Sequence, residues 1–405
     1  MSVTLERALD IIFENVEACG TEILPLTSVL GRIIAKDVKA SINLPPFDNS
    51  AMDGYAVYCS DSNNVLDVIS TIFAGDNSGL TLTKGSVIKI MTGACIPSGT
   101  EAIVPIEDVE HFGEKIKLPK SIKLHNHIRR SGEDVKSGEV IIKAGTTLSA
   151  YQTSLLASQG ISFVEVYKRV EVAVFATGEE LKMPYESLEA NQLFNSNSQT
   201  ILARSEELGA TGIFTGSAKD NLEDIKAHVQ NSLGHDLIIT SGGVSVGDAD
   251  FTKESFASFG FESLFEKIDI KPGKPTIFGK IGNTYVLNLP GNPLAAALIF
   301  EVFGEAIIAK LSGKSCTYRK PMLVKLKNEL KIRAGRDTII AGFYDGEEFE
   351  ISSKRSPGMV SPLSLANAFM IVSSSVEKLS IGSEVKIMPL TFEFSSKVRS
   401  NIFTL

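Results

Sequence analysis

The chain has 405 residues, 43% of them hydrophobic and 22% charged, which is enough sequence for roughly two to four globular domains that each bury a core. A formal net charge of −8 at pH 7 excludes the broad cationic surface that nucleic-acid binding requires. The 4 cysteines are dispersed without a CxxC pair, and the acidic, amphipathic N-terminus is unlike a signal peptide. With no apolar run long enough to span a bilayer, we expect a cytoplasmic protein that engages neither a membrane nor nucleic acid.

The first part of the chain alternates between helical and β-rich character. Apolar residues recur at helical spacing between Leu5 and Val16, which predicts an amphipathic helix. Short runs of Val, Ile and Thr, interrupted by Gly, Asn and Pro, predict a β-rich subdomain over residues 42–128. Residues 129–168 combine glycine turns with a short helix, and we expect them to return to the opening helix. Residues 1–41 and 129–168 are therefore assigned to one helical, linking subdomain.

Regular alternation of strands and helices begins at residue 169. This alternation indicates crossover connections and a mostly parallel, doubly wound α/β domain over residues 169–313. Within it, Gly282-Asn283 separates two strand-like runs and predicts a hairpin. Residues 314–405 lose the helical signal and contain short strands between turn residues, which predict a β-sandwich or barrel.

The segment TSGGVSVGDAD, residues 240–250, follows a predicted strand of the α/β domain. Ligands of open α/β sheets bind beyond the carboxyl ends of the strands, where loops expose backbone N–H groups. Gly242 and Gly243 allow close backbone approach, and Ser241 and Ser245 offer hydroxyl donors, so a phosphate or pyrophosphate would fit. A tight connection that needs glycine for steric reasons is an equally weighted alternative.

Carboxylates accompany this glycine-rich segment. Asp248 and Asp250 follow the glycines directly, and a carboxylate beside a phosphate is unfavourable unless a divalent cation such as Mg²⁺ lies between them. Glu180 and Asp220 occupy other loops that the topology brings to the same edge of the sheet. The N-cap of a helix is an equally weighted explanation of Asp220, and Glu179 is better explained as a solvated turn residue.

Two proline-containing turns offer further anion sites. In KIDIKPGKP, Lys267, Lys271 and Lys274 surround a turn that cannot be helical, which favours oxyanion binding over a merely solubilising role. LPGNP, residues 289–293, ends a strand and opens a long helix, although Asn292 as an N-cap explains most of that motif.

The β-rich part contains polar turns of unusual richness. LPPFDNSAMDGYAV includes Asp53, while Thr92 and Asp134 lie in glycine turns that could aim a side chain. On spacing alone, each of these residues is explained better by a turn than by catalysis. His125 and His127 lack a supporting ligand cluster and are interpreted as surface residues.

The motifs PPFDNSAMDGYAV, IMTGA, RRSGED, ATGEEL, TSGGVSVGDAD, IKPGKP and LPGNPLAA occur in this order and together resemble the molybdopterin molybdenumtransferase family, often called MoeA. Bacterial enzymes and the plant and gephyrin E domains belong to that family. The resemblance is specific from Leu5 to about Gly313 and afterwards rests on length and β character. It implies an elongated homodimer in which a MoaB-like α/β domain joins a helical, linking subdomain, a β-rich subdomain and a C-terminal β-barrel.

The resemblance also implies a transferase of molybdenum cofactor biosynthesis, which inserts molybdate into adenylylated molybdopterin with magnesium-dependent release of AMP. The active site would be shared between two chains, with other molybdenum cofactor biosynthesis proteins as further candidate partners. The catalytic residues implied by similarity are Asp53, Asp134, Glu180, Asp220 and Asp250. The expected magnesium ligands are Asp250, Glu180 and Asp220. The implied substrate-binding residues are Thr92, Ser241, Gly242, Gly243, Ser245, Gly247, Lys267, Lys271, Lys274, Pro290 and Pro293.

Two positions depart from the family pattern without a change of charge. Glu179 stands where Asp is frequent, and Asp248 stands where Glu is frequent. In the C-terminal part, we expect molybdate-contacting groups near Arg336 and Ser361.

Two other functions are consistent with parts of the sequence. Enzymes that adenylylate molybdopterin also contain a MoaB-like domain with an SGG loop, but they lack the long N-terminal arrangement with PPFDNSAMDGYA. A scaffold function, which gephyrin also has, is the non-enzymatic alternative. The absence of a fused second domain and linker favours an enzyme.

Overall fold

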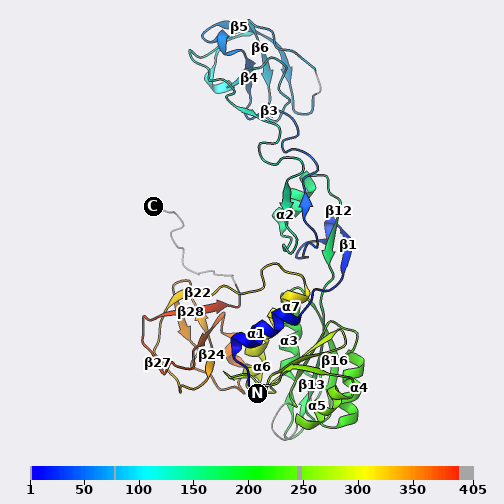
Figure 1. Ribbon diagram of the computed structural model, residues 1–405. Coiled ribbons are helices and arrows are strands. Elements are labelled where there is room, and N and C mark those ends of the chain that lie inside the picture. The colour runs from blue at the N-terminus through cyan, green and yellow to red at the C-terminus, as the bar shows by residue number, and fades with distance from the viewer. Residues whose placement is uncertain (1, 77–78, 244–248, 392–405) are drawn as a thin grey trace.

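The structure is a computed structural model that describes residues 2–76, 79–243 and 249–391. Figure 1 shows an elongated molecule, with a β-rich unit at one end, a narrow linking segment, and an α/β domain beside a barrel at the other end. Within the described residues, no helix combines the length and the hydrophobicity that a transmembrane span needs.

The β-rich unit is a six-stranded sheet with the strand order β7-β4-β6-β5-β9-β8. Its strands are β4 (Gly54–Val57), β5 (Val65–Ile72), β6 (Ser86–Ile90), β7 (Ala102–Pro105), β8 (Glu110–Phe112) and β9 (Lys115–Lys117). Tyr55 and Val57 pack on one side of β4 while Ala56 packs on the other, so this strand is buried on both faces. The alternation follows from the two-residue period of a strand.

The linking segment consists of short strand pairs from both halves of the N-terminal region. Its elements are β1 (Thr21–Pro25), β2 (Val38–Lys39), β3 (Asn49–Ser50), β10 (Ile128–Arg129), β11 (Val140–Ile142), α2 (Ala150–Ser158) and β12 (Phe163–Tyr167). β1 pairs antiparallel with β12, β2 with β11 and β3 with β10. Two chain passes therefore connect the β-rich unit to the rest of the molecule.

The α/β domain contains a sheet with the order β16-β13-β17-β21-β20-β18, in which β16, β13, β17 and β21 are parallel. The strands of this domain are β13 (Glu171–Thr177), β14 (Leu181–Lys182), β15 (Leu193–Phe194), β16 (Thr211–Ala218), β17 (Leu237–Ser241), β18 (Glu262–Phe265), β20 (Ile277–Ile281) and β21 (Thr284–Leu289). β14 and β15 form a separate two-stranded sheet. The helices are α3 (Ser196–Glu207), α4 (Leu222–Ser232), α5 (Ala249–Ala257), α6 (Pro293–Ile299) and α7 (Glu305–Leu311), with the π-helical turn η4 (Phe300–Gly304) between the last two.

Both faces of this sheet are covered by helices. Val172 and Val174 of β13 pack with α3, α6 and α7, whereas Ala173 and Phe175 pack with α4 and α5. The Gly282-Asn283 hairpin is confirmed, because β20 and β21 pair antiparallel with Ile281 opposite Thr284. The predicted doubly wound domain is thereby confirmed.

The C-terminal strands close into a barrel. β24 pairs with β25 on one side and with β26 on the other, so that β24, β25, β22, β28 and β26 form a closed ring. The elements of this region are β19 (Ile270–Lys271), β22 (Met322–Leu326), β23 (Leu330–Lys331), β24 (Asp337–Tyr344), β25 (Glu348–Ile351), α8 (Ser361–Ser364), β26 (Ala368–Val372), β27 (Lys378–Leu379) and β28 (Glu384–Pro389). Of the two architectures predicted for this region, the barrel is the correct one.

The opening helix α1 (Leu5–Asn15) packs differently from our prediction. Leu5, Ile11 and Ile12 are buried in the core of the α/β domain, and α1 contacts α7. Residues 129–168 return instead to the neighbouring strand β1, where Leu156 of α2 belongs to a separate core. The prediction that this stretch returns to the opening helix is wrong, because the apolar face of α1 is already covered by the α/β domain.

Candidate functional site

A cavity of about 660 Å³ lies at the carboxyl edge of the parallel sheet. Thr177 ends β13, Ser241 ends β17 and Pro290 follows β21, and all three line this cavity. Strands that run parallel end at one edge, so their following loops meet there. We call this cavity the sheet-edge cavity.

The two glycines after β17 adopt conformations that a side chain would not tolerate. Gly242 has φ +102° and Gly243 has φ +64°, and both line the sheet-edge cavity. A Cβ atom at Gly242 would lie 2.6 Å from the Thr177 carbonyl oxygen, and one at Gly243 would lie 2.5 Å from Thr252 Oγ1. Glycine is therefore required sterically at both positions, and the same turn places bare backbone on the cavity wall.

Ser241 is held within the protein by a residue that our sequence analysis did not select. Asn197 Nδ2 donates to Ser241 Oγ at 2.6 Å and to the Gly291 carbonyl at 2.7 Å. Asn197 lines the cavity and therefore joins the loops that follow β17 and β21. In the sequence, Asn197 lies in the polar run NSNSQT, which indicates no more than the start of a helix. Asn195 is the cap, since its side chain accepts from Ser198 N at 3.0 Å.

The structure brings two of the predicted carboxylates to the sheet-edge cavity. Glu180 follows β13, Asp220 follows β16, and both line it. Asn221, rather than Asp220, caps α4 by accepting from Asp224 N at 2.9 Å, so the capping explanation of Asp220 is wrong. No group of three His, Cys, Asp or Glu side chains that could hold a metal is assembled among the described residues.

Several predicted residues of this site lie partly or wholly outside the described part. Asp250 belongs to helix α5, but the structure describes only its backbone. Ser245, Gly247 and Asp248 lie outside the described residues. The predicted residues Pro290 and Pro293 both line the cavity.

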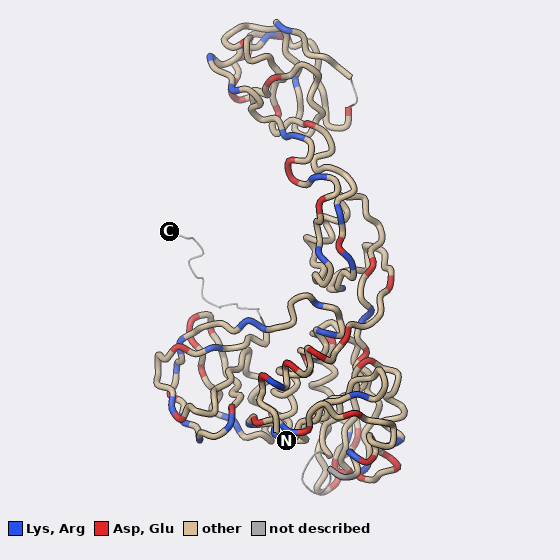
Figure 2. Tube along the Cα trace, viewed as in Figure 1, with Lys and Arg blue, Asp and Glu red and all other residues tan. Residues whose placement is uncertain are grey.

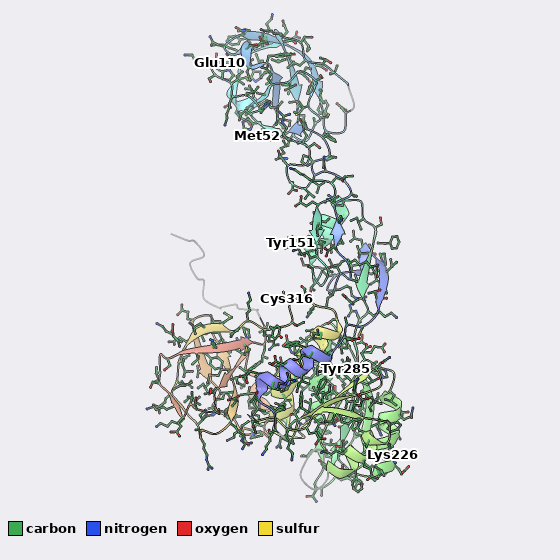
Figure 3. The ribbon with its side chains drawn as sticks, in the orientation of Figure 1. Met52, Glu110, Tyr151, Lys226, Tyr285 and Cys316 are labelled. Carbon is green, nitrogen blue, oxygen red and sulfur yellow. The ribbon has the colours of Figure 1, made fainter. Side chains whose placement is uncertain are left out.

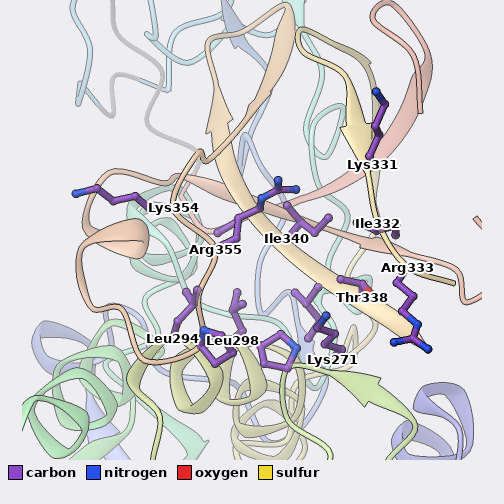
Figure 4. A pocket seen from close by; sticks show the side chains of 14 residues that line it. Lys271, Leu294, Leu298, Lys331, Ile332, Arg333, Thr338, Ile340, Lys354 and Arg355 are labelled. Carbon is purple, nitrogen blue, oxygen red and sulfur yellow. The ribbon is translucent and has the colours of Figure 1, made fainter. Parts of the chain in front are cut away.

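A second cavity, of about 280 Å³, lies between the α/β domain and the barrel. Its lining includes Lys271 from β19 and four cations from the C-terminal region, and no Asp or Glu lines it among the residues that the structure describes. The four C-terminal cations, shown around the cavity in Figure 4, are Lys331, Arg333, Lys354 and Arg355. Figure 2 shows acidic and basic residues interspersed along the described chain, so this cluster is a local feature. We call it the cationic cavity.

Only one of the three predicted lysines lines the cationic cavity. Lys271 is fixed there because β19 pairs with β24, with Lys271 opposite Thr338. Lys267 and Lys274 are exposed and do not line this cavity.

Molybdate-contacting groups were expected near Arg336 and Ser361, but neither of these two residues lines the cationic cavity. The cations that line it are nearby in the sequence, in KIRAGR and SSKRSP, where the pattern alone is typical of solvated turns.

The two cavities adjoin each other. Pro275 and Gly358 line the sheet-edge cavity, whereas Pro272 and Pro357 line the cationic cavity. The same two chain segments, 271–275 and 357–360, therefore contribute to both cavities. An anion in one cavity would be adjacent to a ligand in the other.

The predicted residues of the N-terminal region do not reach these cavities within one chain. Asp53 Oδ1 accepts from Thr92 N and from Thr92 Oγ1, both at 2.7 Å. These two hydrogen bonds hold the pKa of the Asp53 carboxyl below its ordinary value. The bond from the Thr92 backbone has the larger effect, and the bond from its hydroxyl has the next largest. Figure 3 places Met52, which precedes Asp53, at the β-rich unit, far from Tyr285 of the α/β domain.

Asp134 lies on the connection between the linking segment and the β-rich unit. Its backbone N–H donates to the Leu44 carbonyl at 3.0 Å, and its side chain is exposed. Neither Asp134 nor the pair Asp53 and Thr92 lines the sheet-edge cavity of the same chain.

An α/β domain with a glycine turn at its carboxyl edge, beside a cavity lined by cations, offers surfaces that suit anionic ligands. Comparison with known proteins identifies the family. The MoeA N-terminal region (domain I and II) matches residues 3–160, a probable molybdopterin binding domain matches residues 173–310, and the MoeA C-terminal region (domain IV) matches residues 324–390.

Similar proteins cover nearly the whole chain. A molybdopterin molybdenumtransferase from Haemophilus influenzae is 37% identical over 96% of this chain and 98% of its own length. Molybdopterin molybdenumtransferase 2 from Mycobacterium tuberculosis is 32% identical over 94% of this chain and 98% of its own length. The crystal structure of a molybdopterin biosynthesis moea protein from Pyrococcus horikosii has a TM-score of 0.84 at 30% identity, covering 96% of this chain and all of that one.

The chain belongs to the molybdopterin molybdenumtransferase family. It is therefore a transferase of molybdenum cofactor biosynthesis. The predicted family, fold class and enzyme class are confirmed.

Proposed function

We propose that this enzyme inserts molybdate into adenylylated molybdopterin and releases AMP in a magnesium-dependent step. The observation that carries the proposal is the pair of adjoining cavities of different character, one with a glycine turn and carboxylates and one lined by cations. Insertion of an oxyanion into a phosphorylated substrate requires two anions to approach each other. Separate sites with a common wall would hold them in proximity without leaving either charge uncompensated.

The adenylylated substrate is assigned to the sheet-edge cavity. Gly242 and Gly243 place backbone on its wall without a Cβ atom, which suits a pyrophosphate. The carboxylates of Glu180 and Asp220 would repel that group unless a divalent cation lay between them.

This donor set fits magnesium. Carboxylate oxygens are the hard ligands that Mg²⁺ prefers, and Glu180 and Asp220 line the same cavity. We assign Glu180, Asp220 and Asp250 as the residues that would hold the ion. When bound, Mg²⁺ would neutralise charge that develops on the pyrophosphate oxygens.

Molybdate, the second substrate, is assigned to the cationic cavity. Lys271 and Arg355 belong to a lining whose described residues include no carboxylate, and such a group of cations would hold an oxyanion by charge-assisted hydrogen bonds. Lys271 comes from the α/β sequence and Arg355 from the barrel region, so the cavity exists only when the two parts pack together.

A second copy of the chain is proposed to complete the site. Asp53, Thr92 and Asp134 do not line the sheet-edge cavity of their own chain, so they would act at the cavity of a partner. We accordingly propose a cytoplasmic homodimer with composite active sites.

The decisive experiment measures AMP release from adenylylated molybdopterin by the purified protein with Mg²⁺, with and without molybdate. We expect molybdate to increase the rate and magnesium removal to abolish release. AMP release that is indifferent to molybdate would contradict the proposal. Consumption of ATP with unadenylylated molybdopterin would instead indicate an adenylyltransferase.

A further inference from the structure

The rim of the sheet-edge cavity contains exposed apolar side chains. Leu193 is 62% exposed, Phe194 is 45% exposed and Val360 is 56% exposed, and all three line the cavity. Exposed apolar groups beside a polar binding surface mark a place where a ligand covers them. The glycine turn and the carboxylates of this cavity are polar, so an apolar part of a ligand would contact the rim instead.

Phe194 is held on a fixed backbone. β15 pairs in parallel with β14, with Phe194 opposite Lys182. On either side of it, Leu193 N donates to the Glu180 carbonyl and Asn195 N donates to the Lys182 carbonyl, both at 2.8 Å. The following residue, Asn195, is buried and caps α3. An aromatic ring on such a support offers contact area at little conformational cost.

The arrangement matches a ligand with two unlike ends. Backbone at Gly242 and Gly243 suits an anionic group, whereas the ring of Phe194 suits the face of a flat heterocycle. Val360 comes from the segment that precedes α8 and contributes an apolar surface from the barrel side. A sugar phosphate lacks a flat ring that would stack on the aromatic face.

We propose that Phe194 is a substrate-positioning residue on which a nitrogen heterocycle of the substrate stacks, flanked by Leu193 and Val360. The inference rests on the proposed function, because adenylylated molybdopterin supplies two such rings, adenine and pterin. Both rings share the chemistry that Phe194 would recognise.

The absence of tryptophan from the sequence permits a direct test. Phe194→Trp would introduce the sole indole of the protein, and a ring stacked on it should quench its fluorescence. The matched control is Phe343→Trp, since Phe343 is 50% exposed on β24 and does not line the cavity. We expect quenching by AMP or by a pterin phosphate ester in Phe194→Trp alone, and none by ribose 5-phosphate, which has the anion without the ring.

A calorimetric experiment covers the case in which the tryptophan variant is perturbed. Phe194→Leu should weaken the affinity for one of the two ring-containing ligands by roughly tenfold, and Phe194→Tyr should restore it, while Phe343→Leu should leave it unchanged. The ligand that is affected identifies the ring. Circular dichroism would confirm that each variant is folded.

The inference is overturned if neither ring-containing ligand distinguishes the Phe194 variants from the Phe343 variants, or if ribose 5-phosphate quenches equally. That result is distinct from failure of the proposed function. The proposed function fails if the wild-type enzyme releases no molybdate-stimulated AMP, whatever the Phe194 variants do.

Discussion

The side-chain amide of Asn197 donates to Ser241 Oγ at 2.6 Å and thereby ties the beginning of α3 to the end of β17. The same amide nitrogen donates to the Gly291 carbonyl at 2.7 Å. One side chain thus fixes two of the loops that form the sheet-edge cavity. Ser241 is 2% exposed, so its hydroxyl serves this internal bond.

Removal of the Asn197 amide should loosen the glycine turn. We expect Asn197→Ala to lower the free energy of unfolding by about 1–3 kcal/mol, because Ser241 Oγ and the Gly291 carbonyl lose their donor. The KM for adenylylated molybdopterin should rise more than kcat falls, since the defect lies in the binding loops. Denaturant titration and steady-state kinetics would measure both effects. The exposed Asn231 of α4 is the control; equal effects of Asn231→Ala would contradict this role.

The carboxylates of the sheet-edge cavity should determine the magnesium requirement. Glu180→Gln and Asp220→Asn should each raise the Mg²⁺ concentration for half-maximal AMP release by roughly tenfold or more, because each removes a charged oxygen ligand. The neighbouring Glu179 is the matched control, since it is exposed and does not line the cavity. If Glu179→Gln shifted the magnesium dependence as far as Glu180→Gln, the assignment of Glu180 would be wrong.

The cationic cavity should determine the affinity for molybdate. Arg355→Gln should raise the KM for molybdate by roughly tenfold, because it removes a charge-assisted hydrogen-bond donor from a lining without carboxylates. The KM for adenylylated molybdopterin should change much less. Lys386, exposed on β28 outside this lining, provides the control substitution Lys386→Gln. A general effect of both substitutions on both substrates would indicate long-range electrostatics instead.

The Asp53–Thr92 contact predicts a measurable pKa change. Thr92→Val removes the hydroxyl donor and keeps the backbone donor, so the pKa of Asp53 should rise part of the way toward the ordinary value of an aspartate. Because the folded-state pKa is lowered, the charged contact stabilises the fold above the unfolded-state pKa. That stabilisation is lost as the pH falls through the folded-state pKa. An NMR titration of the Asp53 carboxyl carbon would measure the shift, with Thr71→Val on β5 as the control; an unchanged pKa would contradict the role of the hydroxyl.

A composite active site predicts complementation between inactive chains. Asp53→Ala and Glu180→Gln chains, assayed at a low Mg²⁺ concentration at which neither releases AMP alone, should form mixed dimers in which one site combines two intact halves. Random assortment would restore about a quarter of the wild-type AMP release. Mixing Glu180→Gln with Asp220→Asn chains should restore none, because both substitutions affect the same half. Recovery in that control, or its absence in the first mixture, would contradict the shared site.

Short-range sequence patterns determined the hairpin and the doubly wound sheet of the α/β domain. Gly282-Asn283 specified a hairpin because the turn allows only a few residue types, and strand–helix alternation after residue 169 specified a doubly wound sheet. The same alternation placed Glu180 and Asp220 at one edge, because parallel strands end together. These features depend on periodicity and on connections between neighbouring elements, which a single sequence displays.

The tertiary structure decided the features that depend on distant segments. In the sequence, Arg333 and Arg355 stand in segments typical of solvated turns. In the folded chain, barrel closure and the pairing of β19 with β24 place them in one cavity with Lys271. Asn197 lies in a polar run that indicates only a helix start, whereas in the folded chain its amide bonds to two loops. Sequence periodicity gives the apolar face of a helix but not its partner, so the packing of α1 on α7 was also undetermined. The motifs of the sequence therefore sufficed to predict the family and the enzyme class, while long-range packing decided which side chains line the cavities.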